Sequence, residues 1–196
     1  MFRIRKRTIW MIFPLLVWVI LAGRGWAGEG LYNFTSLEDR VFSGARGLGG
    51  INLASGEANL QLNLWSIALG APAYSLAEQE GPCLTSSWPE RALNLISGEA
   101  FSHLRGIFSV NQAAGSGNKE ANLVAISLGQ EVGNHLLARN TGTTARSRLP
   151  VRGEFADVIS GEAFAGARGL VQVNQSSGLA NTVSNQFSLG FKGPVP

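Results

Sequence analysis

Short stretches of the chain alternate between two sets of side chains with a period of two. Residues 107–112 (IFSVNQ) show this alternation, and residues 170–175 (LVQVNQ) show a comparable one. A period of two is typical of a half-buried β-strand. The segments that follow, 113–118 and 176–181, concentrate Gly, Ser and Asn, which favour turns. A second extended arm such as 122–128 comes next, so the pattern predicts a strand-turn-strand unit, folded as a β-arc or as a hairpin.

This unit occurs three times. Residues 42–70, 101–129 and 164–190 align without gaps over their first two-thirds and share the pattern FxxxRGxxx[IV]NxxxGxxNxxxN. Self-similarity of this kind indicates a repeat architecture. The Asn, Gln and Gly residues of the pattern are Asn52, Gly56, Asn59 and Asn63 in the first copy, Asn111, Gln112, Gly115, Asn118 and Asn122 in the second, and Asn174, Gln175, Gly178, Asn181 and Asn185 in the third.

Asparagine at fixed repeat positions predicts side-chain ladders. When equivalent strands stack in register, the amide of an Asn or Gln can hydrogen-bond to the same residue on the next strand. This interpretation is favoured for Asn52, Asn111 and Asn174, which follow a β-branched residue in mid-strand. For Asn59 and Asn118, a role confined to the turn is an equal alternative. The predicted fold is all-β, with three strand-turn-strand repeats stacked as a β-solenoid or cross-β arrangement and joined by irregular linkers.

The N-terminus predicts export. Residues 1–27 have a basic start, an apolar stretch too short to span a bilayer and small residues before a cleavage position after Ala27, as in a secretory signal peptide. Short helices within the linkers, at 75–80 and around 131–138, are an alternative to irregular structure there. The remaining segments are an N-terminal lead (28–41), repeat 1 (42–70), a linker (71–95), repeat 2 (96–129), a linker (130–158), repeat 3 (159–190) and a C-terminal tail (191–196).

Removal of the signal peptide changes the charge balance. The whole chain has 16 basic and 13 acidic residues, a net charge of +3. Five of the basic residues and none of the acidic ones lie in residues 1–27, which leaves 11 against 13 and a net charge of −2. Nucleic-acid binding needs clustered positive charge, so no nucleic-acid specificity is expected. Cys83 is the only cysteine; it is either a small buried residue or a partner for another chain.

No pattern of catalytic residues is present. His103 and His135 are the only histidines, and neither lies near cysteine or carboxylate residues at metal-ligand spacing. The glycine-rich stretches match no phosphate-binding loop, and no nucleophile motif occurs. We therefore expect a structural protein without cofactor, metal or catalytic site, and not an enzyme.

Three arginines recur at one position of the repeat. Arg46, Arg105 and Arg168 each precede a glycine, and stacking would align them in a column. Such a column could contact a partner or bind an anionic polysaccharide. Alternatively, each arginine pairs with a repeated glutamate such as Glu99 or Glu162, or protects a sheet edge from premature pairing.

The residues 110–126 (VNQAAGSGNKEANLVAI) resemble the imperfect repeats of bacterial Fap functional-amyloid subunits and, more distantly, the repeats of curlin. The resemblance implies a chain that is exported through outer-membrane secretion machinery and assembles into cross-β fibres that hold biofilms together. It also implies turn and ladder roles for the matching Asn, Gln and Gly residues. Three features depart from the family pattern: Leu53 replaces a repeat glutamine, Trp65 is bulky for a stacked interface, and the CxxC pair of the fibre subunits is absent.

The sequence therefore predicts a secreted structural protein, located outside the cell or at its surface, that forms or nucleates amyloid-like fibres in biofilm and adhesion. Its partners would be copies of itself or related fibre subunits. The departures favour a minor subunit or nucleator over the main fibre component. Two alternatives stay open: a periplasmic accessory or chaperone-like protein of a fibre-secretion system, and a polysaccharide-binding surface adhesin.

Overall fold

The computed structural model describes residues 31–81, 89–129, 132–140 and 153–191, with the side chains of 134–140 excepted. The predicted signal peptide and Cys83 lie outside these residues. The described ranges form eleven strands and no helix: β1 (Tyr32–Leu37), β2 (Arg46–Ser55), β3 (Leu60–Leu69), β4 (Ala73–Gly81), β5 (Arg91–Ile96), β6 (Arg105–Ser116), β7 (Lys119–Leu128), β8 (Val132–Asn140), β9 (Glu154–Ile159), β10 (Arg168–Leu179) and β11 (Thr182–Phe191).

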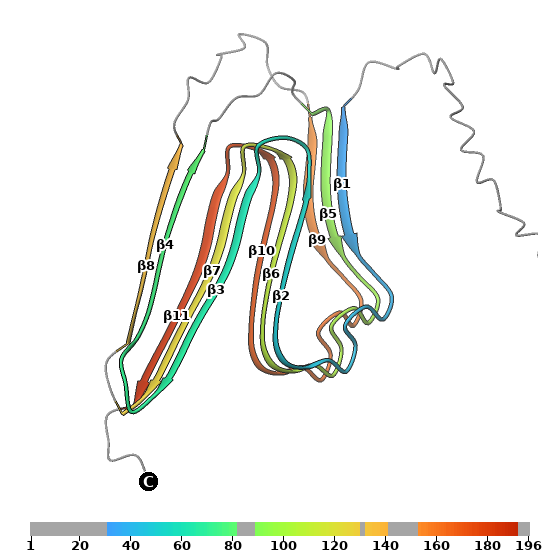
Figure 1. The fold of residues 1–196 in the computed structure, drawn as a ribbon. Helices are drawn as coiled ribbons and strands as arrows, with labels where there is room; N and C mark the ends of the chain where they lie inside the picture. The colour runs from blue at the N-terminus through green and yellow to red at the C-terminus, as the bar shows by residue number, and fades with distance from the viewer. Residues whose placement is uncertain (1–30, 82–88, 130–131, 141–152, 192–196) are drawn as a thin grey trace, which may run out of the picture.

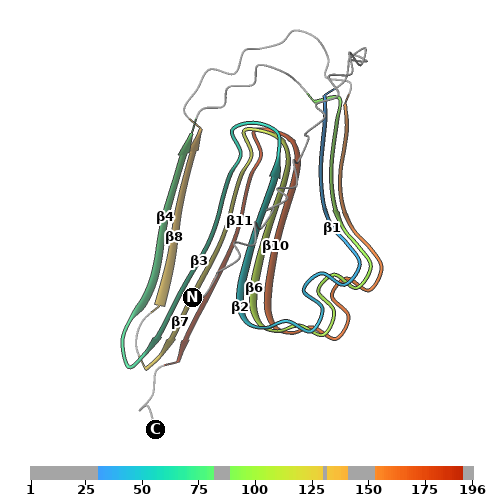
Figure 2. The ribbon, with the colours of Figure 1, turned by 45° about the vertical axis from the view of Figure 1, so that its right-hand side comes forward.

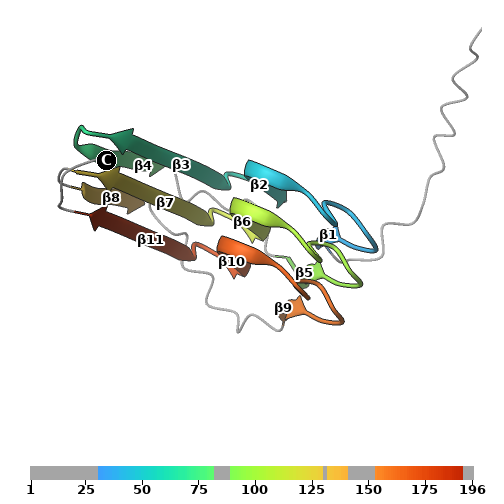
Figure 3. The same ribbon diagram turned by 90° about the horizontal axis from the view of Figure 1, so that it is seen from below.

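Every strand pairs in parallel with the equivalent strand of a neighbouring repeat. The pairs form sheet A (β1-β5-β9), sheet B (β2-β6-β10), sheet C (β3-β7-β11) and sheet D (β4-β8). Equivalent residues are 59 positions apart between the first two repeats and 63 apart between the last two, as in Asn52, Asn111 and Asn174. We call each pass of the chain a rung: rung 1 holds β1–β4, rung 2 holds β5–β8 and rung 3 holds β9–β11. Figure 3 shows the three rungs as superposed layers, which confirms the predicted all-β stack.

Within rungs 1 and 2 the chain runs through the four sheets in turn, and the described part of rung 3 runs through sheets A, B and C. Figures 1 and 2 show sheets A, B, C and D side by side, each joined to the next by a turn at one end. Because β2 and β3 lie in different sheets and their backbones pair only with strands of another rung, the strand-turn-strand unit is a β-arc and not a hairpin.

The segments predicted as linkers contain four strands, β4, β5, β8 and β9. The short helices considered near 75–80 and 131–138 are wrong, because both segments are extended. The buried face of β4 carries only small or polar side chains, so it has no apolar stripe that a sequence pattern could detect. Ser75 and Gln79 on this face instead donate to the backbone carbonyls of Val124 (3.0 Å) and Glu120 (3.0 Å) in sheet C. Side-chain to backbone bonds thus hold sheet D on sheet C, together with the apolar contact of Ala77 with Ala121 and Leu123.

An aromatic stack fills the space between sheets A and B near the turn that joins them. The rings of Phe42, Phe101 and Phe164 lie parallel, with centroids 5.7 and 5.1 Å apart. Phe101 is fully buried and packs in one cluster with Ile96, Leu104, Phe108 and Val110 of the central rung. Burying each large apolar side chain contributes about 1.5–3 kcal/mol, so this cluster is the main apolar core.

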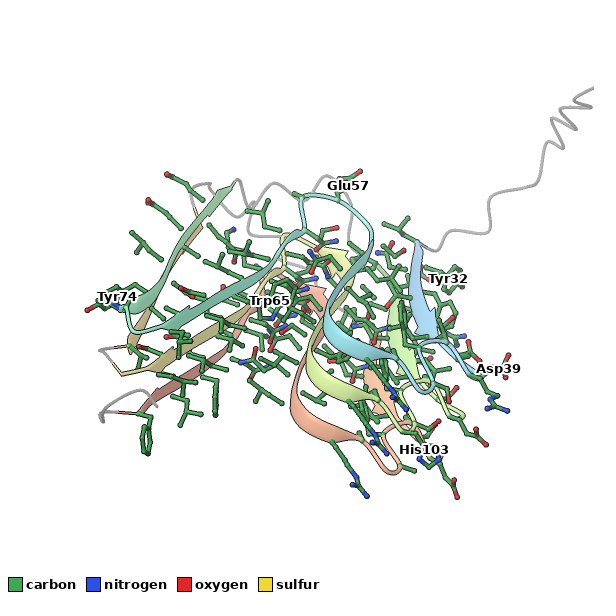
Figure 4. The ribbon with its side chains drawn as sticks, turned by 60° about the horizontal axis from the view of Figure 1, so that its bottom comes forward. Tyr32, Asp39, Glu57, Trp65, Tyr74 and His103 are labelled. Carbon is green, nitrogen blue, oxygen red and sulfur yellow. The ribbon has the colours of Figure 1, made fainter. Side chains whose placement is uncertain are left out.

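Trp65 fits into the stack because its neighbour is small. Its ring lies between sheets B and C (Figure 4), and a Cβ atom added to Gly50 would overlap it. The same position holds Ser109 in rung 2, whose hydroxyl oxygen accepts a hydrogen bond from Trp65 Nε1 (3.2 Å). The bulk that the sequence marks as a departure is therefore offset by a missing side chain on the facing strand.

The repeat glycines at the end of the second strand of each rung are required by backbone shape. Gly56, Gly115 and Gly178 have φ angles of 110°, 121° and 101°, a region that other residues rarely adopt. A Cβ atom at Gly115 would also overlap the carbonyl oxygen of Gly178 in the next rung. Glycine at this position therefore permits both the arc and the close stacking of one arc on another.

Candidate functional site

A ladder of asparagine side chains runs through sheet B. Asn111 Nδ2 donates to Asn52 Oδ1 (2.9 Å), and Asn174 Nδ2 donates to Asn111 Oδ1 (3.0 Å). These asparagines point towards sheet C. Val110, which precedes Asn111 on β6, points to the other face of sheet B, into the apolar core between sheets A and B. The structure therefore places the three residues in one column, one on each rung.

A second ladder faces the first from sheet C. Asn122 Nδ2 donates to Asn63 Oδ1 (3.0 Å), and Asn185 Nδ2 donates to Asn122 Oδ1 (3.1 Å). On each rung the two ladders are joined, as where Asn122 Nδ2 donates to Asn111 Oδ1 (2.9 Å). The amides also reach backbone carbonyls of the facing strand; Asn122 Nδ2, for example, donates to the carbonyl of Val110 (3.1 Å). Six side chains thus form one continuous network between the two sheets.

This network is buried in the middle of the stack. Asn111 and Asn122 have no exposed surface. A net contribution of about 0.5–1.5 kcal/mol is typical of a satisfied hydrogen bond, whereas a buried amide without partners costs about 1–3 kcal/mol. A shift of register by one residue would turn the asparagines of one strand to the opposite face. The network therefore selects a single register.

A third ladder lies at the arc between sheets B and C. The backbone N–H of Asn118 donates to Asn59 Oδ1 (3.0 Å), and that of Asn181 donates to Asn118 Oδ1 (3.1 Å). Asn59 Nδ2 in turn donates to the carbonyl of Gly115 on the next rung (2.9 Å). At this position the side chains lie in the turn and bond to the neighbouring rung.

The glutamine ladder spans only two rungs. Gln175 Nε2 donates to Gln112 Oε1 (2.8 Å), and Gln112 Nε2 donates to the carbonyl of Leu95 in sheet A (3.3 Å). In rung 1 the equivalent residue is Leu53, which has no side-chain donor. The ladder therefore ends at rung 2.

The three repeat arginines are exposed and aligned. Arg46, Arg105 and Arg168 are register partners at the starts of β2, β6 and β10. Within the described ranges, no carboxylate lies within 4.0 Å of them; Glu99 pairs instead with Arg40 (3.6 Å between Nε and Oε2). The column therefore presents positive charge to solvent.

Glu120 is a buried acid that the sequence analysis did not single out. It lies on rung 2 between Gln61 and Val183, where its carboxylate accepts hydrogen bonds from Ser176 Oγ and from Gln61 Nε2 (2.8 Å). Burial raises the pKa of Glu120 to about 8, an effect that these two hydrogen bonds only partly oppose. The signal in the sequence was the charged pair Lys119-Glu120 inside the repeat, at positions where the first copy carries Leu60 and Gln61.

Metal sites and membrane-spanning helices were the other features to look for in the described part of the chain. It holds no group of three or more His, Cys, Asp or Glu residues placed to bind a metal ion. In the same residues, no helix is long and apolar enough to cross a bilayer. His103 lies on the exposed turn between sheets A and B (Figure 4), with a φ angle of 56°.

Parallel strands stacked in register, with amide ladders along the stacking axis, define the class of cross-β, amyloid-type proteins. The model of the functional amyloid protein FapB/FapC family matches residues 26–92 and 83–192, and the chain belongs to this family. The resemblance stated for residues 110–126 is thus confirmed. The chain is a functional amyloid protein, and its family is one of structural proteins and not of enzymes. No solved structure matches the chain.

Replacing Asn122 by leucine should destabilise the stack by about 2–4 kcal/mol, because several buried amide and carbonyl groups lose their partner at once. The measurement is the free energy of unfolding of the monomeric mature chain in urea. Asn185→Leu should cost less, since Asn185 has a neighbouring rung on one side only. The exposed neighbour Ser184→Ala is the matched control. Equal losses for Asn122→Leu and Ser184→Ala would show that the network does not stabilise the fold.

Glu120 should make the stability of the fold depend on pH. Its pKa is about 8 in the folded chain against an ordinary value of 4.5, so between these values the folded state holds a proton that the unfolded state has lost. The free energy of unfolding should therefore be highest below about pH 4.5 and fall as the pH rises to about 8. Glu120→Gln should reduce this decrease and stabilise the chain at pH 8, whereas the exposed control Glu78→Gln should keep it. A wild-type pH profile in Glu120→Gln would contradict the assignment.

Proposed function

We propose that this protein is an exported subunit that forms or nucleates extracellular amyloid-like fibres of a biofilm, as a minor or nucleating component. The observation that carries the proposal is that the stack is open at both ends. The described part of the chain places no further strand beside β1, β2 and β3 on one side, or beside β9, β10 and β11 on the other. Open strand edges pair readily with strands of another chain.

A nucleating role is supported by the three rungs that one chain already contains. Bringing separate strands together costs conformational entropy, and this cost is smaller when the strands belong to one chain whose connections keep them close. The outer strands then present a formed template with the register fixed by the amide network. A copy of this chain or a related fibre subunit with equivalent repeats would add to that template, outside the cell after passage through outer-membrane secretion machinery.

The arginine column favours a second, additional function in contact with the biofilm matrix. Arg46, Arg105 and Arg168 repeat at the strand spacing of about 4.8 Å, and rung-on-rung assembly would extend the column along a fibre. Like charges this close repel one another, so binding of an anionic polysaccharide along the column would relieve the repulsion. Such binding would give the fibre an adhesive surface.

The purified mature chain, lacking residues 1–27, tests the fibre proposal. We expect it to form fibres that bind an amyloid dye and give a reflection near 4.7 Å in X-ray fibre diffraction. Asn122→Leu should abolish or strongly delay assembly, and Ser184→Ala should assemble like the wild type. A stable monomer that slows the assembly of a related subunit would contradict the proposal and favour the accessory protein instead.

A further inference from the structure

The two ends of the stack differ in the hydrogen-bonding groups that they present. In sheet B the side-chain N–H groups point towards rung 1 and the side-chain oxygens towards rung 3. Asn52 Nδ2, on rung 1, consequently donates to no group of the described residues, although Asn52 Oδ1 accepts from Asn63 and Asn111. The outer surface of rung 1 therefore presents an amide donor from this ladder.

The ladder in sheet C has the same direction. Asn122 donates towards rung 1 and Asn185 donates to Asn122, which leaves Asn185 Oδ1 without a donor among the described residues. Donors at one end and acceptors at the other make the two end surfaces complementary to each other. Within these two ladders, neither end is complementary to itself.

The charges on the turn between sheets A and B also differ between the two ends, with a basic residue on rung 1 and an acidic residue on rung 3. The register places Arg40, Glu99 and Glu162 at equivalent positions of the three rungs, and Arg40 forms an ion pair with Glu99. Glu162 has no basic side chain within 4.0 Å in the described ranges. One rung further along the axis, the residue at this position would be the Arg40 of another copy.

The end surfaces also differ in shape. Rung 3 has a hollow of about 400 Å³ between β10 and β11, lined by residues 170–173 and 185–187. The register partners of this lining in rung 1 include Leu48, which is 53% exposed, and Trp65. Continuation of the stack would place these two apolar side chains over the hollow and cover them.

We propose that a second copy of this chain binds with its rung 1 surface on the rung 3 surface of the first, always in the same parallel orientation. Arg40 of one copy then lies opposite Glu162 of the next, and Asn52 donates to Asn174. The opposite arrangement, rung 1 on rung 1, would reverse the strands of one copy, so the ladders would not continue and Glu162, which lies on rung 3, could not meet Arg40. A head-to-tail contact of this kind does not close, so the filament is polar. The proposal rests on the proposed fibre function and specifies its contact.

Charge reversal tests the orientation. Monomers of Glu162→Arg, of Arg40→Glu or of both together are added to wild-type seeds, and elongation is followed by dye fluorescence at low salt. Head-to-tail stacking predicts that each variant alone elongates at least about threefold more slowly than the wild type, because every contact between its own copies joins like charges. An equimolar mixture of the two variants should recover, since alternating copies then bring opposite charges together at every contact. High salt should reduce these differences.

Two further variants separate the contact from the fold. Glu78→Arg makes the same charge change on the exposed side of β4 and should elongate like the wild type. Asn52→Asp keeps the oxygen that Asn63 and Asn111 use and replaces the outward donor by a charged oxygen, which would face the Asn174 oxygen of the next copy. Because Asn52 is exposed in one copy, this variant should change the free energy of unfolding little and slow elongation.

Single variants that elongate as fast as the wild type, or a mixture that does not recover, would overturn the head-to-tail contact while the fibre function stands. Wild-type protein that forms no fibres would overturn both. An Asn52→Asp chain that elongates normally would show that the ladders do not continue across the contact.

Discussion

The buried amide network between sheets B and C is the interaction on which the rest of the stack depends. Asn111 and Asn122 lose all contact with water, and only the partners on the neighbouring rungs and strands replace the lost hydrogen bonds. Backbone pairing alone would tolerate several registers, because parallel strands bond equally well after a shift. The amides remove that freedom, since a shifted strand would leave them buried and unpaired.

Other features of the chain follow from this single register. Gly115 must be a glycine because the backbone of the next arc, at Gly178, lies directly against it. Gly50 must be small because the ring of Trp65 occupies the space that its side chain would fill. The stacked rings of Phe42, Phe101 and Phe164 add apolar stabilisation along the same axis. Each of these contacts stabilises the stacking of equivalent residues from neighbouring rungs, and the addition of another chain would need the same stacking. On the proposed assembly, folding of one copy and growth of a fibre thus use the same contacts.

The sequence predicts the repeated part of this architecture because repetition itself carries the information. The spacing of Asn52, Asn111 and Asn174 predicts the ladder, and the family match agrees with the resemblance at residues 110–126. Sheet D could not be predicted, because the buried face of β4 is small and polar, and it packs on sheet C through bonds to backbone carbonyls and through the small apolar side chain of Ala77. The direction of the ladders is equally hidden, since an asparagine in the sequence does not show which way its amide points.

Disulfide trapping of one register pair tests the in-register stack most directly. Tyr32 and Arg91 are exposed partners in sheet A, and parallel neighbours lie about 4.8 Å apart, within the range of a disulfide. In a chain with Cys83→Ser, the pair Tyr32→Cys and Arg91→Cys should close within one dilute monomer. Tyr32→Cys with Ala92→Cys should not close, because Ala92 points to the opposite face. Bridges that form only between chains, or equally well in both pairs, would contradict the stack.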